Sequence, residues 1–235
     1  MGVCLRIMAT LSSSTVSDIL QLISDLRGES AVNTDALRIR AVSNAERDFA
    51  RRNFWRVHLI RNATTTGDGT GDYTIGSSTY PMREKGLSEV YIGGQTEDKR
   101  VAIVDYMQYQ NLINNNAAAK IAYEWYDQAT DAWKMHINPV VAVADTIYYS
   151  YFFQPPIRTA TSDAVICPNI RVIALLAMAD IYHGEEELQK EQLAKQEAEQ
   201  LIEELIGMEQ SPAHNQLYAM TAIENSITPR GFGSY

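Results

Sequence analysis

The stretch from Asp163 to Gly207 constrains the fold more than any other part of the sequence. Within it, residues 170–182 are apolar at almost every position and contain only two charged side chains. A helix that is apolar on all sides is either buried on all sides or spans a membrane. Because spanning takes roughly 20 apolar residues, this shorter run predicts a central buried helix. Pro168 suits the first turn of that helix, and Gly184 suits its left-handed end.

The next segment, residues 185–206, combines dense charge with an apolar stripe at helical spacing from Leu188 to Ile206, which predicts an amphipathic helix. It holds eight glutamates against two lysines, so its net charge is −6 in a chain whose total is −9. The glutamates form either a solvated outer face or a surface toward a polyanion or a basic partner. The residues that we single out are Glu191, Glu197, Glu199, Glu203 and Glu204.

Two helices are expected near the start of the chain, over residues 16–26 and 35–52, the second capped by Asn33 or Thr34. Arginines dominate the polar face of the second helix, namely Arg38, Arg40, Arg47, Arg51 and Arg52. A face of this kind either binds nucleic acid or forms salt bridges between subunits. A chain that is acidic as a whole is a poor candidate for wrapping DNA, because phosphate neutralisation needs Lys and Arg.

At Phe54-Trp55 the hydrophobic period changes from helical to alternating, which predicts strands. We expect strands over residues 55–62, 72–75, 87–92, 100–104, 121–126, 133–137, 140–143 and 146–153, and a short helix over 106–113. The sequence therefore predicts an α+β protein in which N-terminal helices (1–54) and C-terminal helices (157–208) pack together as a bundle. An antiparallel β-rich domain (55–156) is inserted between them, and an extended tail (209–235) follows.

Residues that could carry catalysis or hold a metal do not occur in a productive pattern. The histidines His58, His136, His183 and His214 lie far apart, and none has a second ligand three or four residues away. The glycine-rich run 67–72 lacks the Lys-Ser/Thr of a phosphate-binding loop and the terminal Glu of a calcium loop. We therefore predict a flexible hairpin loop there, no enzyme activity, no metal and no cofactor.

The order of these elements resembles the head–tail connector proteins of tailed bacteriophages, also called adaptor or head-completion proteins. The resemblance is to the tail-tubular-protein-A-like kind, which joins the portal to a short tail tube. It rests on the two N-terminal helices with Phe54-Trp55, on the aromatic strand that ends at Pro156, on Cys167-Pro168 before the buried helix, and on the acidic helix. It covers most of the chain and depends on element order and hydrophobic pattern.

The resemblance implies a structural virion protein that forms a closed ring, usually a dodecamer. Such a ring lies at the head–tail interface, is assembled in the host cytoplasm, and has no membrane partner. It contacts the portal protein and a tail tube or nozzle protein, and double-stranded DNA passes through it without sequence-specific binding.

For such a ring we expect roles for three sets of residues: the arginine face, the acidic helix and the C-terminal tail. The arginine face of one subunit meets the acidic helix of the next, or the acidic helix lines the channel and repels DNA. The tail docks on the portal through the aromatic side chains Tyr218, Phe232 and Tyr235.

A soluble ligand- or glycan-binding module of the virion is the alternative function. That alternative predicts a monomer with a concave pocket lined by Trp125 or Trp133. A ring and a monomer are distinguished by mass alone.

Overall fold

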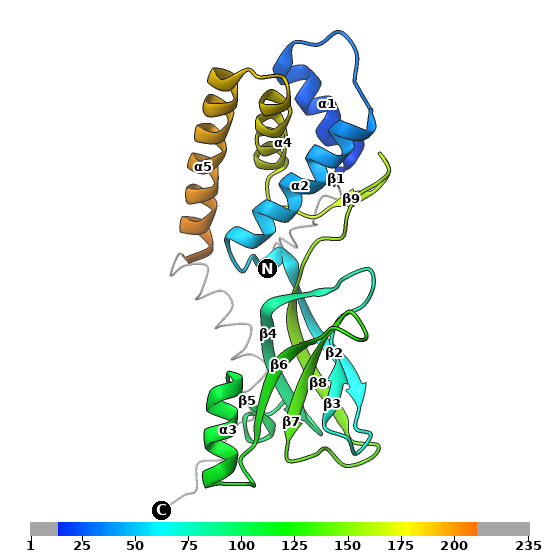
Figure 1. Ribbon diagram of the computed structural model, residues 1–235, viewed down its shortest axis with the longest axis vertical. Coiled ribbons are helices and arrows are strands. Elements are labelled where there is room, and N and C mark those ends of the chain that lie inside the picture. Colours follow the sequence, from blue (N-terminus) through cyan, green and yellow to red (C-terminus); the bar gives the residue numbers. More distant parts are fainter. Residues whose placement is uncertain (1–13, 211–235) are drawn as a thin grey trace, which may run out of the picture.

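The computed structural model describes residues 14–210. Helices occupy both ends of this range and strands the middle (Figure 1), so the predicted α+β class is confirmed. The helices are α1 (Val16–Arg27), α2 (Ala36–Arg52), α3 (Tyr106–Asn115), α4 (Ile170–Gly184) and α5 (Leu188–Gln210). The strands are β1 (Ser14–Thr15), β2 (Leu59–Thr66), β3 (Asp72–Thr74), β4 (Met82–Ile92), β5 (Ala102–Ile103), β6 (Ile121–Asp127), β7 (Ala132–Asn138), β8 (Thr146–Phe153) and β9 (Ala164–Val165).

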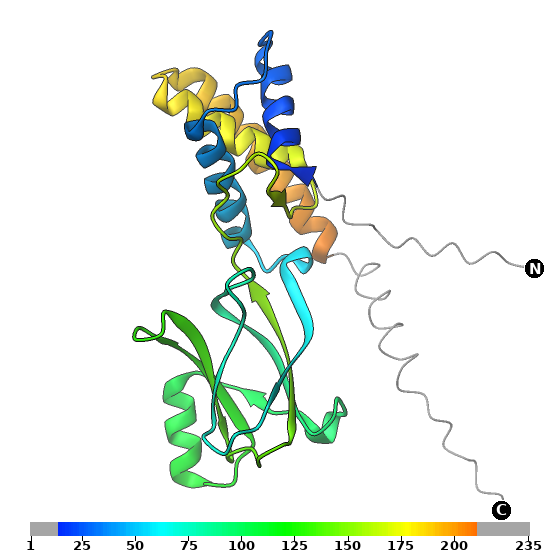
Figure 2. The same cartoon turned by 90° about the vertical axis from the view of Figure 1, so that its right-hand side faces the viewer.

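Helix α4 is the centre of the helical region, as its all-round apolar sequence predicts. It contacts α1, α2 and α5, and its residues Val172, Ile173 and Ala177 are fully buried. In two perpendicular views α1, α2, α4 and α5 lie at one end of the molecule, and the two larger sheets lie at the other end together with α3 (Figures 1 and 2). Residues far apart in the sequence, from both ends of the chain, thus share one apolar core.

The two ends of α4 differ from the prediction. Asn169 is the N-cap and its side chain accepts a hydrogen bond from the Arg171 N–H (2.9 Å), so Pro168 precedes the helix instead of entering its first turn. Gly184 is the last helical residue, and the left-handed conformation falls on Glu186 (φ 62°). The backbone N–H of Glu187 donates to the Tyr182 carbonyl there, which closes the turn two residues later than expected.

The N-terminal helices begin with capping residues. Thr15 and Asp18 form a reciprocal capping box at the start of α1, and Gly28 ends the helix in the left-handed conformation (φ 68°). At α2 the N-cap is Asp35, whose carboxylate accepts the Arg38 N–H (2.8 Å). The expected cap Asn33 instead accepts a hydrogen bond from the backbone N–H of Asp35 (3.0 Å).

The strands form two sheets, in the orders β2-β8-β4 and β3-β7-β6-β5, and their apolar faces share a second core. The expectation of a purely antiparallel region is wrong, because β5 and β6 pair in parallel. Helix α3 connects these two strands, and a parallel pair needs such a crossover. The short pair β1–β9 lies apart from both sheets, beside the helices.

Several predicted strands have different boundaries, since β4 begins at Met82 instead of residue 87 and β5 covers only Ala102–Ile103. The strand expected from residue 55 begins at Leu59, after a 3₁₀ turn, while Trp55 packs in the helical core and stacks on Phe49 (4.3 Å between ring centroids). Residues 140–143 are a loop instead of a strand. The adjoining backbone pairs with the glycine-rich loop, since Gly67 donates to the Asp145 carbonyl (2.8 Å) and accepts from the Ala144 N–H.

Arg83 on β4 connects the strand region to the end of α2. Its Nη1 donates to the carbonyl oxygens of Ala50 (2.6 Å) and Asn53 (2.9 Å), and its guanidinium lies over the Phe54 ring (4.3 Å). The last carbonyls of a helix lack intrahelical partners and carry partial negative charge. The arginine therefore completes the C-terminal end of α2 from a different part of the chain.

Replacing Arg83 by methionine is expected to lower the free energy of unfolding by about 2 kcal/mol, because charge-assisted hydrogen bonds to buried carbonyls are lost. The melting temperature should fall by roughly 4–8 °C for a chain of this size. Urea denaturation of both proteins measures the loss. The control is Arg100→Met. Among the described residues Arg100 forms an ion pair only with the exposed Glu97, so its replacement should change stability by less than about 0.5 kcal/mol. Equal losses in both variants would contradict the capping role of Arg83.

Candidate functional site

Within residues 14–210, no group of three or more His, Cys, Asp or Glu side chains is arranged to hold a metal ion. In the same range no helix has the length and apolar content needed to cross a membrane. Cys167 is buried, and the burial raises the pKa of its thiol to about 12. The thiol is therefore protonated at neutral pH, which is the unreactive form.

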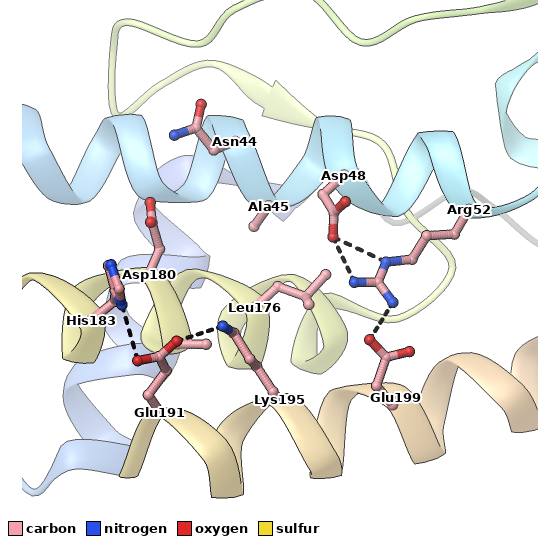
Figure 3. Close-up of a pocket in the computed structure, with 11 residues that line it drawn as sticks. Asn44, Ala45, Asp48, Arg52, Leu176, Asp180, His183, Glu191, Lys195 and Glu199 are labelled. Carbon is pink, nitrogen blue, oxygen red and sulfur yellow. Dashed lines mark hydrogen bonds and ion pairs between the residues drawn. The ribbon is translucent and has the colours of Figure 1, made fainter. Parts of the chain in front are cut away.

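Three of the charged residues singled out from the sequence, Arg52, Glu191 and Glu199, line a groove of about 320 Å³ between α2 and α5, with α4 as its floor (Figure 3). At one end of the groove Arg52 donates to Asp48 on its own helix (2.8 Å) and to Glu199 on α5. These contacts join α2 to α5 across α4. They also mean that Arg52 and Glu199 already have partners inside the subunit.

Glu191 occupies the other end of the groove. It is nearly buried and accepts hydrogen bonds from Lys195, one turn further along α5, and from Nδ1 of His183 at the end of α4 (3.1 Å). Both partners favour the ionised carboxylate and lower the pKa of Glu191, with Lys195 the larger cause. Glu191 therefore fixes the start of α5 against α4.

The five candidate glutamates do not share one face of α5. Glu197 pairs with Arg171 of α4, whereas Glu199 faces α2. Residues two apart on a helix differ by about 200° in direction, so these two carboxylates lie on opposite flanks. Glu203 and Glu204 are exposed and form no ion pair among the described residues. The solvent face between the flanks is mostly uncharged and holds Gln189, Gln192, Leu193, Gln196, Gln200 and Gly207.

The five candidate arginines are likewise divided. Arg38 is almost buried and forms a bidentate pair with Glu29 (2.6 and 2.7 Å), which lowers the pKa of that carboxyl to about 2. Arg52 belongs to the groove. Of the remaining three, Arg40 and Arg51 are exposed and Arg47 is half-buried with its Nε covered, and none of the three forms an ion pair within the described range.

The tail residues proposed for portal docking, Tyr218, Phe232 and Tyr235, lie outside the described residues. Of the predicted tail, the described part is helical, because α5 continues to Gln210. Leu188, expected in the apolar stripe of α5, is instead mostly exposed, since the turn before α5 places it at the first helical position. The stripe that packs on α4 consists of Ala194, Ala198, Leu201, Ile202, Leu205 and Ile206.

Sequence reasoning missed a buried ion pair. Glu46 on α2 is fully buried and accepts from Nε and Nη2 of Arg158 (both 2.8 Å) and from the backbone N–H of Ile166 (2.9 Å). The sequence held one signal, because Glu46 follows Val42 by four residues and precedes Phe49 by three, on the apolar side of the helix. A charged residue at such a position predicts a buried partner.

Sequence reasoning also missed two exposed leucines. Leu37 on α2 is 75% exposed and Leu193 on α5 is 66% exposed. A scattered exposed leucine is ordinary on a protein surface. These two are notable because each lies on the solvent face of a helix that also holds unpaired charges.

The described residues thus form an α+β protein whose helices α2 and α5 carry exposed charged side chains. The family model described as SU10 adaptor protein matches residues 14–222. The chain belongs to the SU10 adaptor protein family, which confirms the resemblance to phage head–tail adaptors drawn from element order. No curated protein matches the chain.

Membership identifies the chain as a structural adaptor of bacteriophage virions. The family is not known for enzyme activity. The family match does not distinguish subtypes of adaptor, so the tail-tubular-protein-A-like subtype is still a prediction from the sequence.

Proposed function

We propose that the chain forms a closed ring of identical subunits between the portal protein and the tail tube or nozzle protein. The observation that carries this proposal is the adaptor family match over residues 14–222. The ring encloses the channel through which double-stranded DNA passes, and a dodecamer is the expected size. Portal and tail partners fit a virion component at the head–tail junction that is assembled in the host cytoplasm.

The charges that lack ion-pair partners among residues 14–210 support a head-to-tail ring. Arg40 and Arg51 are exposed and Arg47 is half-buried on α2, and Glu203 and Glu204 are exposed on α5. In a cyclic ring each subunit presents one surface to the next, so opposite charges on different faces are complementary. The other candidate charges are neutralised within the subunit and contribute to folding instead.

The channel role of α5 is a second part of the proposal. If α5 faced the channel, Gln at Glu204 should leave the ring intact and change DNA packaging or release. Glu197 and Glu199 are unsuitable for this test, because their replacement also breaks the ion pairs with Arg171 and Arg52. Deletion of residues 211–235 should abolish portal binding and leave the fold intact if the tail is the docking segment.

Mass by light scattering tests the ring, first on the full chain alone and then after mixing with the portal protein of the same phage. We expect either a discrete ring or a smaller species that joins the portal in a fixed ratio. A monomer that ignores the portal would contradict the proposal and favour the ligand- or glycan-binding alternative. That alternative has one supporting feature: Trp133 lines a hollow of about 440 Å³ with Leu87, Ile103 and Tyr106.

A further inference from the structure

We propose that the solvent face of α5 packs, in parallel and in a defined register, against the solvent face of α2 in a neighbouring copy of this chain. This inference rests on the proposed ring and identifies the helices that would hold it together. The α2 face consists of Leu37, Arg40, Asn44, Arg47 and Arg51, and the α5 face of Leu193, Gln196, Gln200, Glu203 and Gly207. We call these the α2 stripe and the α5 stripe.

The two stripes have the same spacing. Within each, successive residues are separated by three, four, three and four positions, the alternation that keeps one seam of a helix facing a partner helix. Each stripe lies opposite the side of its helix that packs on α4, as shown by the buried Ala45 and Phe49 of α2 and the buried Ala198 and Ile202 of α5. The residues of both stripes are exposed except Arg47, which is half-buried and whose Nε is covered without a hydrogen-bond partner in the described part of the chain.

Aligning the stripes in the same direction pairs chemically matched residues. Leu37 faces Leu193 of the neighbouring copy, which removes two exposed apolar side chains from water. Asn44 faces Gln200, an amide pair that can exchange hydrogen bonds. Arg47 faces Glu203, which brings together two charges that are unpaired among the described residues. An antiparallel alignment also brings a charge pair together, Arg40 with Glu203, but it separates the two leucines and places Arg51 beside Leu193 and Leu37 beside Gly207.

The direction of the helices agrees with a cyclic ring. Residue numbers increase in the same direction along α2 and α5 (Figure 3), and Arg52 at the end of α2 meets Glu199 in the middle of α5. The proposed register places Arg51 beside Gly207 of the neighbouring copy, nine residues or roughly 13 Å further along α5 than its level within the subunit. The ring axis is therefore inclined to the helices, and a small rotation about it keeps the two helices roughly parallel. Because α4 lies between α2 and α5, their outward faces point to different sides of the subunit (Figure 3). Each copy can thus present the α2 stripe to one neighbour and the α5 stripe to the other.

Gly207 gives an independent indication of close approach. A glycine inside a helix is destabilising by roughly 1 kcal/mol relative to alanine. A Cβ built at Gly207 meets no atom within 4 Å in the described chain, so packing inside the subunit does not require a glycine. In the aligned register Gly207 faces Arg51 of the neighbouring copy, where a missing side chain makes room for the long arginine.

Cysteine cross-linking tests the register. In a chain carrying Cys4→Ser, the pair Leu37→Cys and Leu193→Cys should form disulfides between copies under mild oxidation and give a ladder of oligomers on denaturing gels. Cys167 is kept because it is buried. The control is Leu37→Cys with Gln189→Cys, which is on the same face of α5 but one turn, about 6 Å, away. That shift exceeds the range that a disulfide tolerates, so the control should form at least about tenfold less ladder.

A charge exchange tests the ion pair in the otherwise native chain. Arg47→Glu and Glu203→Arg should each raise the concentration needed for assembly at least tenfold, a factor worth about 1.4 kcal/mol. Combined in one chain they should restore assembly to within about threefold of the native protein. Combining Arg47→Glu with Glu197→Arg should not restore assembly, because Glu197 lies on the flank of α5 that faces Arg171.

The outcomes separate this interface from the ring itself. Rings of fixed mass without the 37–193 cross-link and without charge rescue would overturn the α2–α5 seam and leave the proposed function standing. A chain that assembles neither alone nor on the portal would overturn both.

Discussion

Glu46→Ala is expected to lower the free energy of unfolding by about 3–5 kcal/mol, the range measured when one partner of a buried ion pair is removed. Arg158 loses both carboxylate contacts, and the backbone N–H of Ile166 loses its acceptor. The segment that returns from the strands to α4 is held against α2 by these three bonds. Losing the three bonds should loosen the contact of this segment with α2, and thereby the packing of α2 on the central helix α4.

Thermal and urea denaturation measure this effect, and a fall of roughly 10 °C in melting temperature is expected. The matched control is Glu97→Ala, an exposed glutamate whose only ion pair among the described residues is a surface contact with Arg100, which should change stability by less than about 0.5 kcal/mol. A double variant, Glu46→Leu with Arg158→Met, should recover much of the loss because no buried charge is left without a partner. A Glu46→Ala protein as stable as its control would contradict the structural role of the pair.

Acidification from pH 7.5 to pH 5 is expected to lower the free energy of unfolding by about 2 kcal/mol through His58. The ring is 2% exposed, and its Nε2 donates to the Ile166 carbonyl (2.8 Å) in the neutral form. Burial lowers the pKa of His58 from 6.5 to about 4. Between these two values the unfolded chain binds a proton that the folded chain excludes, so stability is complete above pH 6.5 and falls as the pH approaches 4.

Urea denaturation at several pH values checks this prediction. His58→Gln, which keeps an N–H donor for Ile166, should be less stable at pH 7.5 but should lack the extra slope between pH 7.5 and 5. Glu29 does not interfere in this window, because its pKa is lowered from 4.5 to about 2 and its contribution is lost only below pH 4.5. The same slope in the native chain and in His58→Gln would show that another group is responsible.

Local pattern was sufficient for most of the fold. The continuous apolar run of α4 predicts burial on all sides, and the alternation from Thr146 to Phe153 predicts the central strand β8. The parallel β5–β6 pair was not predictable in this way, because strand direction depends on how α3 crosses between them. The shift from Gly184 to Glu186 at the end of α4 also depends on the neighbouring helix, since the turn must deliver the chain to α5.

For the charged surfaces of α2 and α5, too, the sequence determined one part and the tertiary structure another. The sequence by itself determined that α2 is rich in arginine and α5 in glutamate, because composition and the helical period are local properties. Only the tertiary structure decided which of these charges form ion pairs inside the subunit. Arg52 and Glu199 are separated by 147 residues, and their contact exists because α2 and α5 both pack on α4. The charges that this packing leaves unpaired, with Leu37 and Leu193 beside them, are the ones available to another subunit.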